Sequence, residues 1–559
     1  MPTPVAGEGP ERGAPAPQAE RWDRFVAEFV EAYLEANPTA AVHLGRHEFD
    51  GRLPDWSRAG LEGEVARLQR SRERALEFPP DGLDDRRAFE RDYLLAVVDG
   101  EIFWLDAVGW PFRSPTHYAW PLDPTVYLMR EYAPLEERML GFIGWARAVP
   151  EAALRIRENL SGPMPRTYVE IGRTSFGGLA SYLEGDAPRA FGAVCNEALH
   201  RQLREAVGGA VRALRELDEW FASREAEAGE AYALGPEMFA RMLQATERVN
   251  VPLDELERAG REELERELAA LQEACAAYAP GIPAARCISR MRAKKPEGGP
   301  VEGARRQLGT LRSFVLERDL VTIPDGGEAR VAQSPPHMRW NAAYIDIPGP
   351  FEQGVPAVFY LAPPDPAWSA AERDAYLPGE ADLLFVSAHE VWPGHYLHFL
   401  HANHSLNALG RVFVGYAFSE GWAHYTEEMM WEAGLGGGDA ETRIGQLMNS
   451  LLRTVRLLVA IGLHTGTKTV PEAERMFREV AFQDAANARQ QAARGTFDPA
   501  YLNYTLGKLL IRRMRQDWTA PRGGRTAWRE FHDRLLSYGG PPLPLVRAAM
   551  LGDGGSSLL

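Results

Sequence analysis

The residues with the clearest chemical potential in this 559-residue sequence lie between positions 387 and 432. A His389–Glu390 pair opens the stretch, and His395 follows six positions after His389. Glu420 lies 25 positions beyond His395. Imidazole and carboxylate are the ligands that a hydrolytic zinc ion uses, and a carboxylate beside a ligand can act as general base. We therefore expect a zinc hydrolase, in which the metal ligands are His389, His395 and Glu420 and the base is Glu390.

The spacing of the two histidines differs from the usual zinc motif, in which they are four residues apart on one helical face. A separation of six rotates His395 by about 240° from His389 on a regular helix. Pro393 and Gly394 lie between them, and both residue types permit a kink. We therefore expect a helix irregularity at Trp392–Gly394 that turns His395 back towards the metal. If the helix ran straight, the third ligand would instead be His398 or Glu427.

The residues after Glu420 have the spacing of a supporting layer. His424 and Glu427 follow at i+4 and i+7, on the same helical face. Side chains in such positions can orient metal ligands by hydrogen bonding. The alternative is that Glu420 is only a capping or exposed carboxylate. The remaining histidines nearby are expected to lie on a solvated helix, His398, His401 and His404.

The elements that must position these residues are predominantly helical. From residue 21 to about 318 the sequence consists of amphipathic runs separated by Pro/Gly breaks, as in Phe78–Gly82 and Tyr278–Pro283. Their apolar stripes predict core-facing helices. The predicted helices cover residues 24–38, 58–77, 86–105, 135–160, 197–224 and 253–278. After residue 366 further helices are expected at about 382–399, 413–432, 441–463, 471–493 and 499–517.

The sequence changes character between residues 319 and 364, where Pro and β-branched residues become frequent. Two short apolar runs, Ala343–Ile347 and Ala357–Leu361, are separated by turn residues and predict a small hairpin or edge strands. An exposed strand beside the metal helix can hold an extended peptide by main-chain pairing, which makes Tyr360 a substrate-binding candidate. The alternative is a strand that only packs on helices.

The amino-acid composition disfavours several classes of function and indicates a cellular location. The net charge of −16 disfavours nucleic-acid binding, and 45% hydrophobic residues are ordinary for a globular protein. No run approaches the roughly 18 apolar residues of a membrane span. Three cysteines without a CxxC pair predict neither a disulfide framework nor a cysteine zinc site. Residues 1–18 lack secretory-signal features and are expected to be a disordered lead-in, which makes the cytoplasm the default location.

Two lobes are expected after this lead-in. A helical lobe covers residues 19–318, and a catalytic lobe covers residues 319–559. The alternative is one continuous domain. The protein is expected to act as a monomer or a homodimer.

Four motifs carry a family resemblance. HEVWPGHYLH, FSEGWAHYTEE, RTVRLLVAIGLH and DPAYLNYTLGKL, in that order, resemble the bacterial family known as domain of unknown function 885 (DUF885). That family looks like a branch of the mostly helical zincin metallopeptidases. The resemblance implies a mainly α, two-lobed fold with a small sheet near the active-site helix. It also implies the ligands and base named above, with further site-lining residues Arg456, His464 and Tyr504.

The sequence departs from the family pattern at two places. Ala460 and Ile461 stand where the family often has an Asp-Thr pair, which removes an orienting carboxylate for His464. His398 stands where a Gln is common, which argues against His398 as an essential ligand.

The expected reaction is metal-assisted hydrolysis of a peptide, in which Glu390 takes a proton from water and delivers it to the leaving amine. Tyr504 and His464 are candidate donors to the oxyanion, and Arg456 is a candidate for binding a substrate carboxylate. Each of these three is also compatible with a structural hydrogen bond. Two rivals are a zinc hydrolase of a small amide, such as an acylated amino acid, and a peptide-binding relative without turnover. The intact Glu390 argues against the second.

Overall fold

The computed structural model describes residues 17–324, 327–335, 338–339, 341–405 and 407–552. Helices dominate it, and three short strands interrupt them after residue 329. The predicted lead-in of residues 1–18 lies almost wholly outside the described residues. Before the strands the α-helices are α1 (Gln18–Ala36), α2 (Pro38–His43), α3 (Arg58–Leu76), α4 (Asp85–Ile102), α5 (Thr116–Ala119), α6 (Thr125–Met129), α7 (Leu135–Asn159), α8 (Arg166–Gly185), α9 (Ala187–Ala190), α10 (Glu197–Arg224), α11 (Pro236–Glu247), α12 (Leu253–Tyr278), α13 (Ala284–Arg292) and α14 (Pro300–Glu317).

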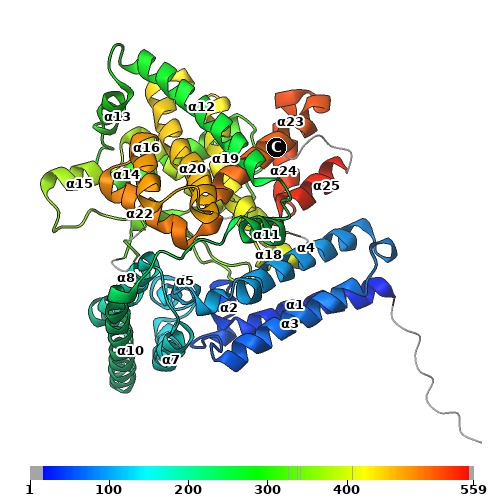
Figure 1. The fold of residues 1–559 in the computed structure, drawn as a ribbon, viewed down its shortest axis with the longest axis vertical. Helices are drawn as coiled ribbons and strands as arrows, with labels where there is room; N and C mark the ends of the chain where they lie inside the picture. The colour runs from blue at the N-terminus through cyan, green and yellow to red at the C-terminus, as the bar shows by residue number, and fades with distance from the viewer. Residues whose placement is uncertain (1–16, 325–326, 336–337, 340, 406, 553–559) are drawn as a thin grey trace, which may run out of the picture.

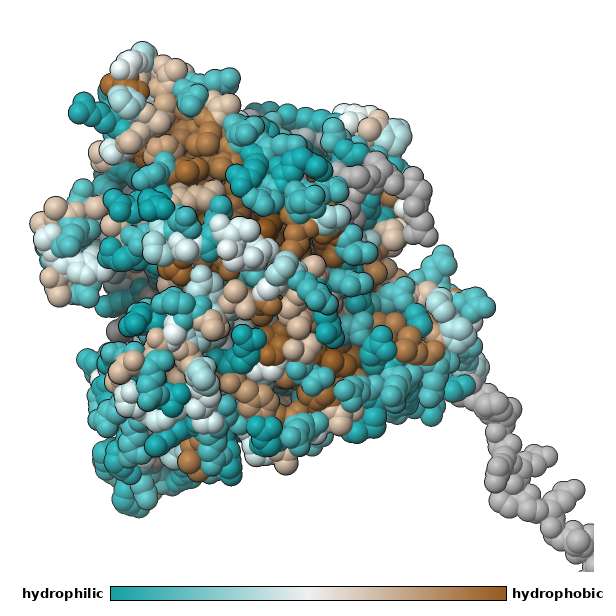
Figure 2. Space-filling model, viewed as in Figure 1, coloured by the Kyte–Doolittle hydropathy of each residue, from teal (hydrophilic) through white to brown (hydrophobic). Residues whose placement is uncertain are grey.

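All six helices expected before residue 318 are present; five have both ends within three residues of the prediction, and the helix predicted from residue 24 begins six residues earlier, at Gln18. In α1 the apolar stripe faces the core as predicted, since its buried residues include Trp22, Phe25 and Phe29 on one face. α1 ends at Ala36, just before Pro38, since proline cannot continue the hydrogen-bond ladder. The outer faces of such helices, for instance α10, are mainly hydrophilic in Figure 2, as amphipathic packing requires.

The strands form one small mixed sheet with the order β1–β3–β2. The two predicted apolar runs are β2 (Ala343–Asp346) and β3 (Val358–Leu361), which pair antiparallel. β1 (Arg330–Gln333) was not expected, and it pairs parallel to β3. Because β3 is central, β2 is an edge strand, and β2 packs against the helix that carries His389.

The second half of the chain supplies the helices around the candidate site. They are α15 (Ala370–Tyr376), α16 (Glu380–Glu390), α17 (His395–Asn403), α18 (Ala408–Val412), α19 (Tyr416–Glu432), α20 (Ala440–Thr465), α21 (Val470–Glu479), α22 (Ala485–Phe497), α23 (Asn503–Thr519), α24 (Trp528–Leu536) and α25 (Leu543–Leu551). The single helix expected at 471–493 is two helices. Phe482 adopts a left-handed φ of 52° between them, and the side chain of Asp484 caps α22.

α20 is the central helix of this half, and its hydropathy and length are enough for a membrane span. However, 89% of its apolar window is buried inside the structure. The apolar character of α20 therefore reflects contact with other helices on nearly every side.

Packing crosses the boundary predicted at residues 318/319. Buried apolar residues from Trp22 to Val546 belong to one core cluster. In Figure 1 the green helix α12 lies among α16, α19 and α20, away from the blue helices α1–α4. α12 packs along α20, and α19 packs along α23. Helices from both sides of the predicted boundary therefore share buried contacts, and a second, smaller core cluster lies among α12, α13 and α20.

The cysteine prediction is wrong in one respect. Cys275 and Cys287 form a disulfide, with a Cα–Cα distance of 5.8 Å, and the exposed Cys195 is free. Cys275 lies near the end of α12 and Cys287 lies in α13, and the turn at Tyr278–Pro283 folds one helix back on the other. This reversal brings the two side chains together, and a count of cysteines does not reveal it.

Candidate metal centre

The helix expected at 382–399 is interrupted between the two histidines. α16 ends at Glu390 and α17 begins at His395, which confirms the predicted irregularity. Gly394 makes the close approach possible, since a Cβ built there would lie 1.7 Å from the carbonyl oxygen of His389. The backbone N–H of Gly394 donates to the carbonyl of Ala388 at 2.9 Å. The chain therefore doubles back, and His395 is turned towards the end of α16.

The three predicted ligands converge. Nε2 of His389 and Nε2 of His395 each lie 3.3 Å from Oε2 of Glu420. The ligand atoms all lie within 4.8 Å of one another. α16, α17 and α19 thus contribute one ligand each, at the place where the three helices meet. The straight-helix alternatives, His398 and Glu427, are not needed.

Each imidazole is oriented through its other ring nitrogen. Nδ1 of His389 lies 2.8 Å from Oε1 of Glu427, whose side chain is fully buried. Nδ1 of His395 lies 3.3 Å from the hydroxyl of Ser419. Partners of this kind fix the ring and leave Nε2 free to bind a metal. Glu427 therefore has its expected supporting position, whereas His424 contacts the Tyr504 carbonyl and Ser450 instead.

The electrostatics fit a bound cation. Burial raises the pKa of Glu420, but the charges and hydrogen bonds of His395 and His389 outweigh it and hold the pKa well below its ordinary value. Glu420 is therefore ionised. Its Oε2 is buried without a hydrogen bond of good geometry, although it faces both imidazoles. A buried, ionised oxygen facing two imidazole nitrogens is a donor set that suits zinc.

Glu390 occupies the last position of α16, next to the ligands. Burial raises the pKa of its carboxyl, and the nearby His389 and His395 oppose the rise. Its side chain forms no hydrogen bond with any residue that the structure describes. The carboxylate is therefore free to accept a proton from a water molecule at the cluster.

Tyr504 lies at the edge of the cluster, as expected. Its ring centroid is 6.3 Å from that of His389, and the charge of Glu420 contributes to raising its pKa, after burial. The Arg456 guanidinium lies over the same ring, 4.7 Å from its centroid. The structure thus brings Tyr504 next to His389 and places Arg456 on the Tyr504 ring.

His464 is not part of this group. Arg453 contacts Glu427 at 3.1 Å, but His464 is eleven residues further along α20, about 16 Å by helical rise. Both ring nitrogens of His464 are used by the backbone. Nδ1 accepts from the N–H of Leu234 at 3.3 Å, and Nε2 donates to the carbonyl of Gly495 at 2.8 Å. We therefore correct its assignment from oxyanion donor to a structural histidine.

His398 and Tyr360 also lie apart from the ligands. His398 is fully buried, and its Nε2 donates to the carbonyl of Gly539 at 2.6 Å. Burial lowers the His398 pKa to about 3. Tyr360 is in the central strand, stacks on Tyr344 and lines a cavity of about 640 Å³ that also reaches Trp392. Its predicted contact with substrate therefore has no direct geometric link to the metal ligands.

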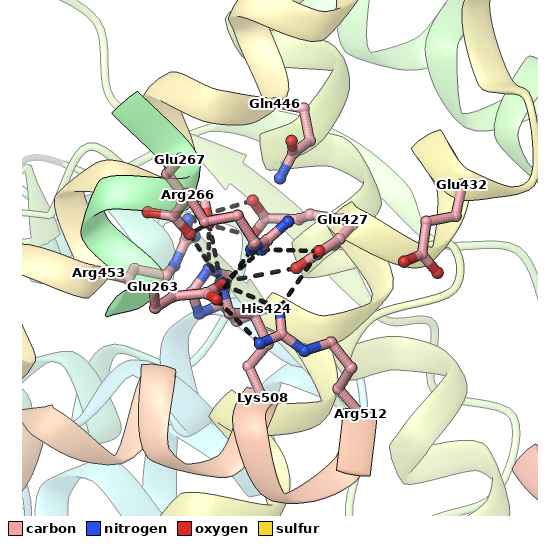
Figure 3. A network of polar contacts seen from close by, with 12 residues as sticks. Glu263, Arg266, Glu267, His424, Glu427, Glu432, Gln446, Arg453, Lys508 and Arg512 are labelled. Atoms are coloured by element: carbon pink, nitrogen blue, oxygen red, sulfur yellow. Dashed lines mark hydrogen bonds and ion pairs between the residues drawn. The ribbon is translucent and has the colours of Figure 1, made fainter. Parts of the chain in front are cut away.

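Behind the ligands lies a second polar group, the buried ion network, drawn in Figure 3. Lys508 of α23 is fully buried, and its ammonium lies 2.7 Å from Glu263 and 2.8 Å from Glu267 of α12. Glu428 of α19 lies 3.7 Å from the same ammonium. Two arginines complete the network, Arg266 and Arg512. Three carboxylates therefore face three cations, and the network joins α12, α19 and α23.

Sequence reasoning missed two residues near Tyr504. Arg494 of α22 lies 5.9 Å from the Tyr504 ring centroid, and Gln491 accepts a hydrogen bond from Nε of Arg456 at 2.9 Å. Their spacing of three residues on one helix was a possible signal, but no metal-ligand residue type drew attention to α22.

Comparisons with known proteins agree on the family and the fold. A family model described as "Bacterial protein of unknown function (DUF885)" matches residues 38–550. No curated protein matches this sequence. A crystal structure from Colwellia psychrerythraea, described as "the putative lipoprotein", has 16% identity and a TM-score of 0.80 over 95% of this chain and 98% of its own. A "putative lipoprotein of unknown function" from Shewanella oneidensis has 20% identity and a TM-score of 0.77 over 95% and 99%.

Proposed function

The chain belongs to the DUF885 family, and we propose that it is a zincin-like zinc metallopeptidase that cleaves peptides with Glu390 as general base. The observation that carries this proposal is the convergence of His389, His395 and Glu420 within 4.8 Å. Glu390 lies beside them with no competing hydrogen bond among the described residues. A structural cluster would have no need for a free carboxylate at that position.

A bound zinc ion would supply Lewis acidity that activates water and polarises a carbonyl group. The chain's own residues do the proton chemistry. Glu390 takes a proton from the water and passes it to the leaving nitrogen, and its raised pKa suits both transfers near neutral pH. Tyr504 is placed to donate to the oxyanion, an interaction typically worth about 3–4 kcal/mol.

The edge strand β2 offers a surface for the substrate main chain. One side of β2 pairs with β3, and no described strand pairs with its other side. β2 also packs on α16, the helix that carries His389 and Glu390. Main-chain pairing along β2 would hold an extended peptide close to His389, His395 and Glu420 without selecting for particular side chains of the peptide.

Two alternatives to peptide cleavage share this site. A zinc hydrolase of a small acylated amino acid would use the same ligands and base, and substrate profiling separates it from a peptidase. A peptide-binding relative without turnover would have no use for Glu390 as a base. The free carboxylate of Glu390 favours both enzymes over the binding protein.

The test compares Glu390→Gln, Glu420→Gln and Tyr504→Phe for zinc content, by elemental mass spectrometry, and for hydrolysis of a pooled peptide library. Glu390→Gln should retain zinc and lose about 10²–10⁴-fold in turnover, since it removes only an acid–base group. Glu420→Gln should lose zinc, because it removes a charged ligand. Tyr504→Phe should retain zinc with an intermediate loss of turnover. A fully active, zinc-loaded Glu390→Gln protein would rule out this mechanism.

We further propose that the protein works in an oxidising compartment rather than the cytoplasm. Disulfides persist mainly outside the cytosol, and Cys275 and Cys287 are paired in this structure. Two proteins of the same fold are described as putative lipoproteins. Thiol titration of protein isolated from its native cells should detect one free thiol per denatured chain, that of Cys195. Three free thiols would show that Cys275 and Cys287 are reduced, and would support the cytoplasm as the location instead.

A further inference from the structure

Three guanidinium groups surround the ring of Tyr504. Their central carbons lie 4.7 Å (Arg456), 5.8 Å (Arg453) and 5.9 Å (Arg494) from its centroid. They come from α20 and α22, whereas Tyr504 comes from α23. The Tyr504 ring also packs at 6.3 Å from the ring of His389. The guanidinium cluster therefore meets the predicted metal ligands in two ways, through the Tyr504 ring and directly, since a terminal nitrogen of Arg453 lies 3.2 Å from Nδ1 of His389.

Only two of these three cations have a carboxylate partner. Arg453 pairs with Glu427 at 3.1 Å, and Arg494 pairs with Asp498 at 2.8 Å. Arg456 has a neutral partner, the side-chain oxygen of Gln491, which accepts from Nε. Neither terminal nitrogen of Arg456 donates to a residue in the described part of the chain. The cluster thus has one more positive charge than its protein partners neutralise.

The unneutralised charge of Arg456 is buried, and its burial destabilises the folded protein. Arg456 is 7% exposed, and burial lowers its pKa, with Arg494 and Arg453 adding to the effect. A buried charge without a counter-ion destabilises a fold strongly, and a cation–π contact offsets only part of that cost. The terminal nitrogens of Arg456 are not among the fully buried side-chain atoms that lack a hydrogen-bond partner. The Arg456 guanidinium therefore has the environment of a group that binds an anion from outside the chain.

We propose that Arg456 binds a free carboxylate of the substrate, located one or two residues beyond the cleaved amide. The inference rests on the proposed hydrolase and names its substrate class. A planar guanidinium matches a carboxylate with two parallel hydrogen bonds, which a neutral amide end cannot form. The Tyr504 ring that Arg456 covers at 4.7 Å also packs at 6.3 Å from the His389 ring, and two residues of extended chain span about 7 Å. Both a peptide C-terminus and an N-acyl amino acid carry such a group.

The activity test uses the zinc-loaded full-length protein and pooled N-acetylated hexapeptides of mixed sequence, prepared as free acids and as C-terminal amides. A pool of N-acetyl amino acids distinguishes the two sources of the carboxylate. Mass spectrometry of the competing substrates gives relative kcat/KM. Wild-type protein should cleave one class of acid near its carboxyl end, with the matching amide at least about 10-fold slower.

Arg456→Gln should lower kcat/KM for the acids by about 10- to 100-fold and leave the amides unchanged, because only the acids lose a charged partner. Arg456→Lys should retain part of the preference, since it keeps the charge without the bidentate geometry. The matched control is Arg489→Gln, which makes the same change on the exposed face of α22. This control should behave like wild type with every pool.

A second measurement does not depend on turnover. Equilibrium dialysis measures binding of the same pools to Glu390→Gln protein, with and without the additional Arg456→Gln change. Acids should bind at least about 10-fold more tightly than amides to the first protein and equally to the second.

The outcomes separate the two proposals. Equal use of acids and amides by wild type, or equal losses for both in Arg456→Gln, overturns the carboxylate site and leaves the hydrolase intact. Binding of acids through Arg456 without hydrolysis of any pool supports the carboxylate site and overturns the hydrolase. Neither binding nor hydrolysis overturns both.

Discussion

Two carboxylates about two turns apart on α19 have different charge environments. Glu428 meets Lys508, Arg266 and Arg512, so the chain itself supplies the cations. Glu420 faces the imidazoles of His389 and His395, and the second nitrogen of each ring contacts another side chain. The carboxylates of the ion network are paired with cations of the chain itself, whereas Glu420 forms no ion pair with a lysine or arginine among the described residues. The comparison teaches that the two groups differ in charge balance rather than in burial.

An unpaired oxygen alone does not mark a ligand. Glu247 of α11 also has a buried Oε2 without a partner, while its Oε1 accepts from the N–H of Ala417 and from Asn503. Burial raises the Glu247 pKa to about 8, so this carboxyl is protonated and neutral over most of the acid range. Glu420 has its pKa lowered and stays ionised. Only an ionised oxygen that faces other donors has the electrostatics of a metal ligand.

The largest effect is expected in the ion network. Burial lowers the Lys508 pKa, but Glu263, Glu267 and Glu428 outweigh it, so the ammonium remains charged. Lys508→Met should reduce the free energy of unfolding by about 3–5 kcal/mol, because it leaves buried carboxylates without their cation. Denaturant unfolding measures this loss. Arg513→Met on the outer face of α23 is the control, since a partly exposed pair contributes little.

A loss below about 1 kcal/mol for Lys508→Met would contradict the comparison. It would mean that the carboxylates take up protons or reach water, and that the network does not need the cation supplied by the chain.

A smaller effect is expected behind the metal cluster. Glu427→Gln keeps an acceptor for Nδ1 of His389 but removes its charge and the partner of Arg453. Zinc affinity should fall by about 10- to 100-fold, as for other groups that orient metal ligands. Chelator competition measures the affinity. Glu432→Gln, at the far end of α19 and paired with Arg515, should bind zinc like wild type. Unchanged zinc affinity in Glu427→Gln would show that the ion pair behind His389 is only structural.

Glu247 is expected to make the stability of the protein depend on pH. Its pKa is raised in the folded state, so the folded protein binds more protons than the unfolded one between about pH 4.5 and 8. Its contribution to stability is therefore full below pH 4.5 and is lost as pH rises towards 8, by up to about 1.4 kcal/mol per unit. Glu247→Gln should remove this slope, and should be more favourable to stability at pH 8 than at pH 5. Parallel stability profiles for variant and wild type would show that Glu247 stays ionised throughout.

The sequence by itself determined the long helices and singled out His389, His395 and Glu420, which the fold brings together. The period of apolar residues located the long helices, since one stripe must face a core wherever that core lies. The types and order of His389, Glu390, His395 and Glu420 indicated a zinc site. Pro393 and Gly394 predicted the break between the histidines, because both act locally on the backbone.

Only the tertiary structure decided the hydrogen-bond, disulfide and charge partners that come from distant parts of the sequence. The ring nitrogens of His464 are bound by backbone groups from α22 and from the segment before α11, and no local pattern reveals such partners. The pairing of Cys275 with Cys287 required the reversal between two helices. Arg494 has a local partner in Asp498, four residues further on, but only the assembled helices bring Glu427 to Arg453 and leave Arg456 without a carboxylate among the described residues. Charge balance is a sum over neighbours from many elements, and for that reason it is fixed only in the folded chain.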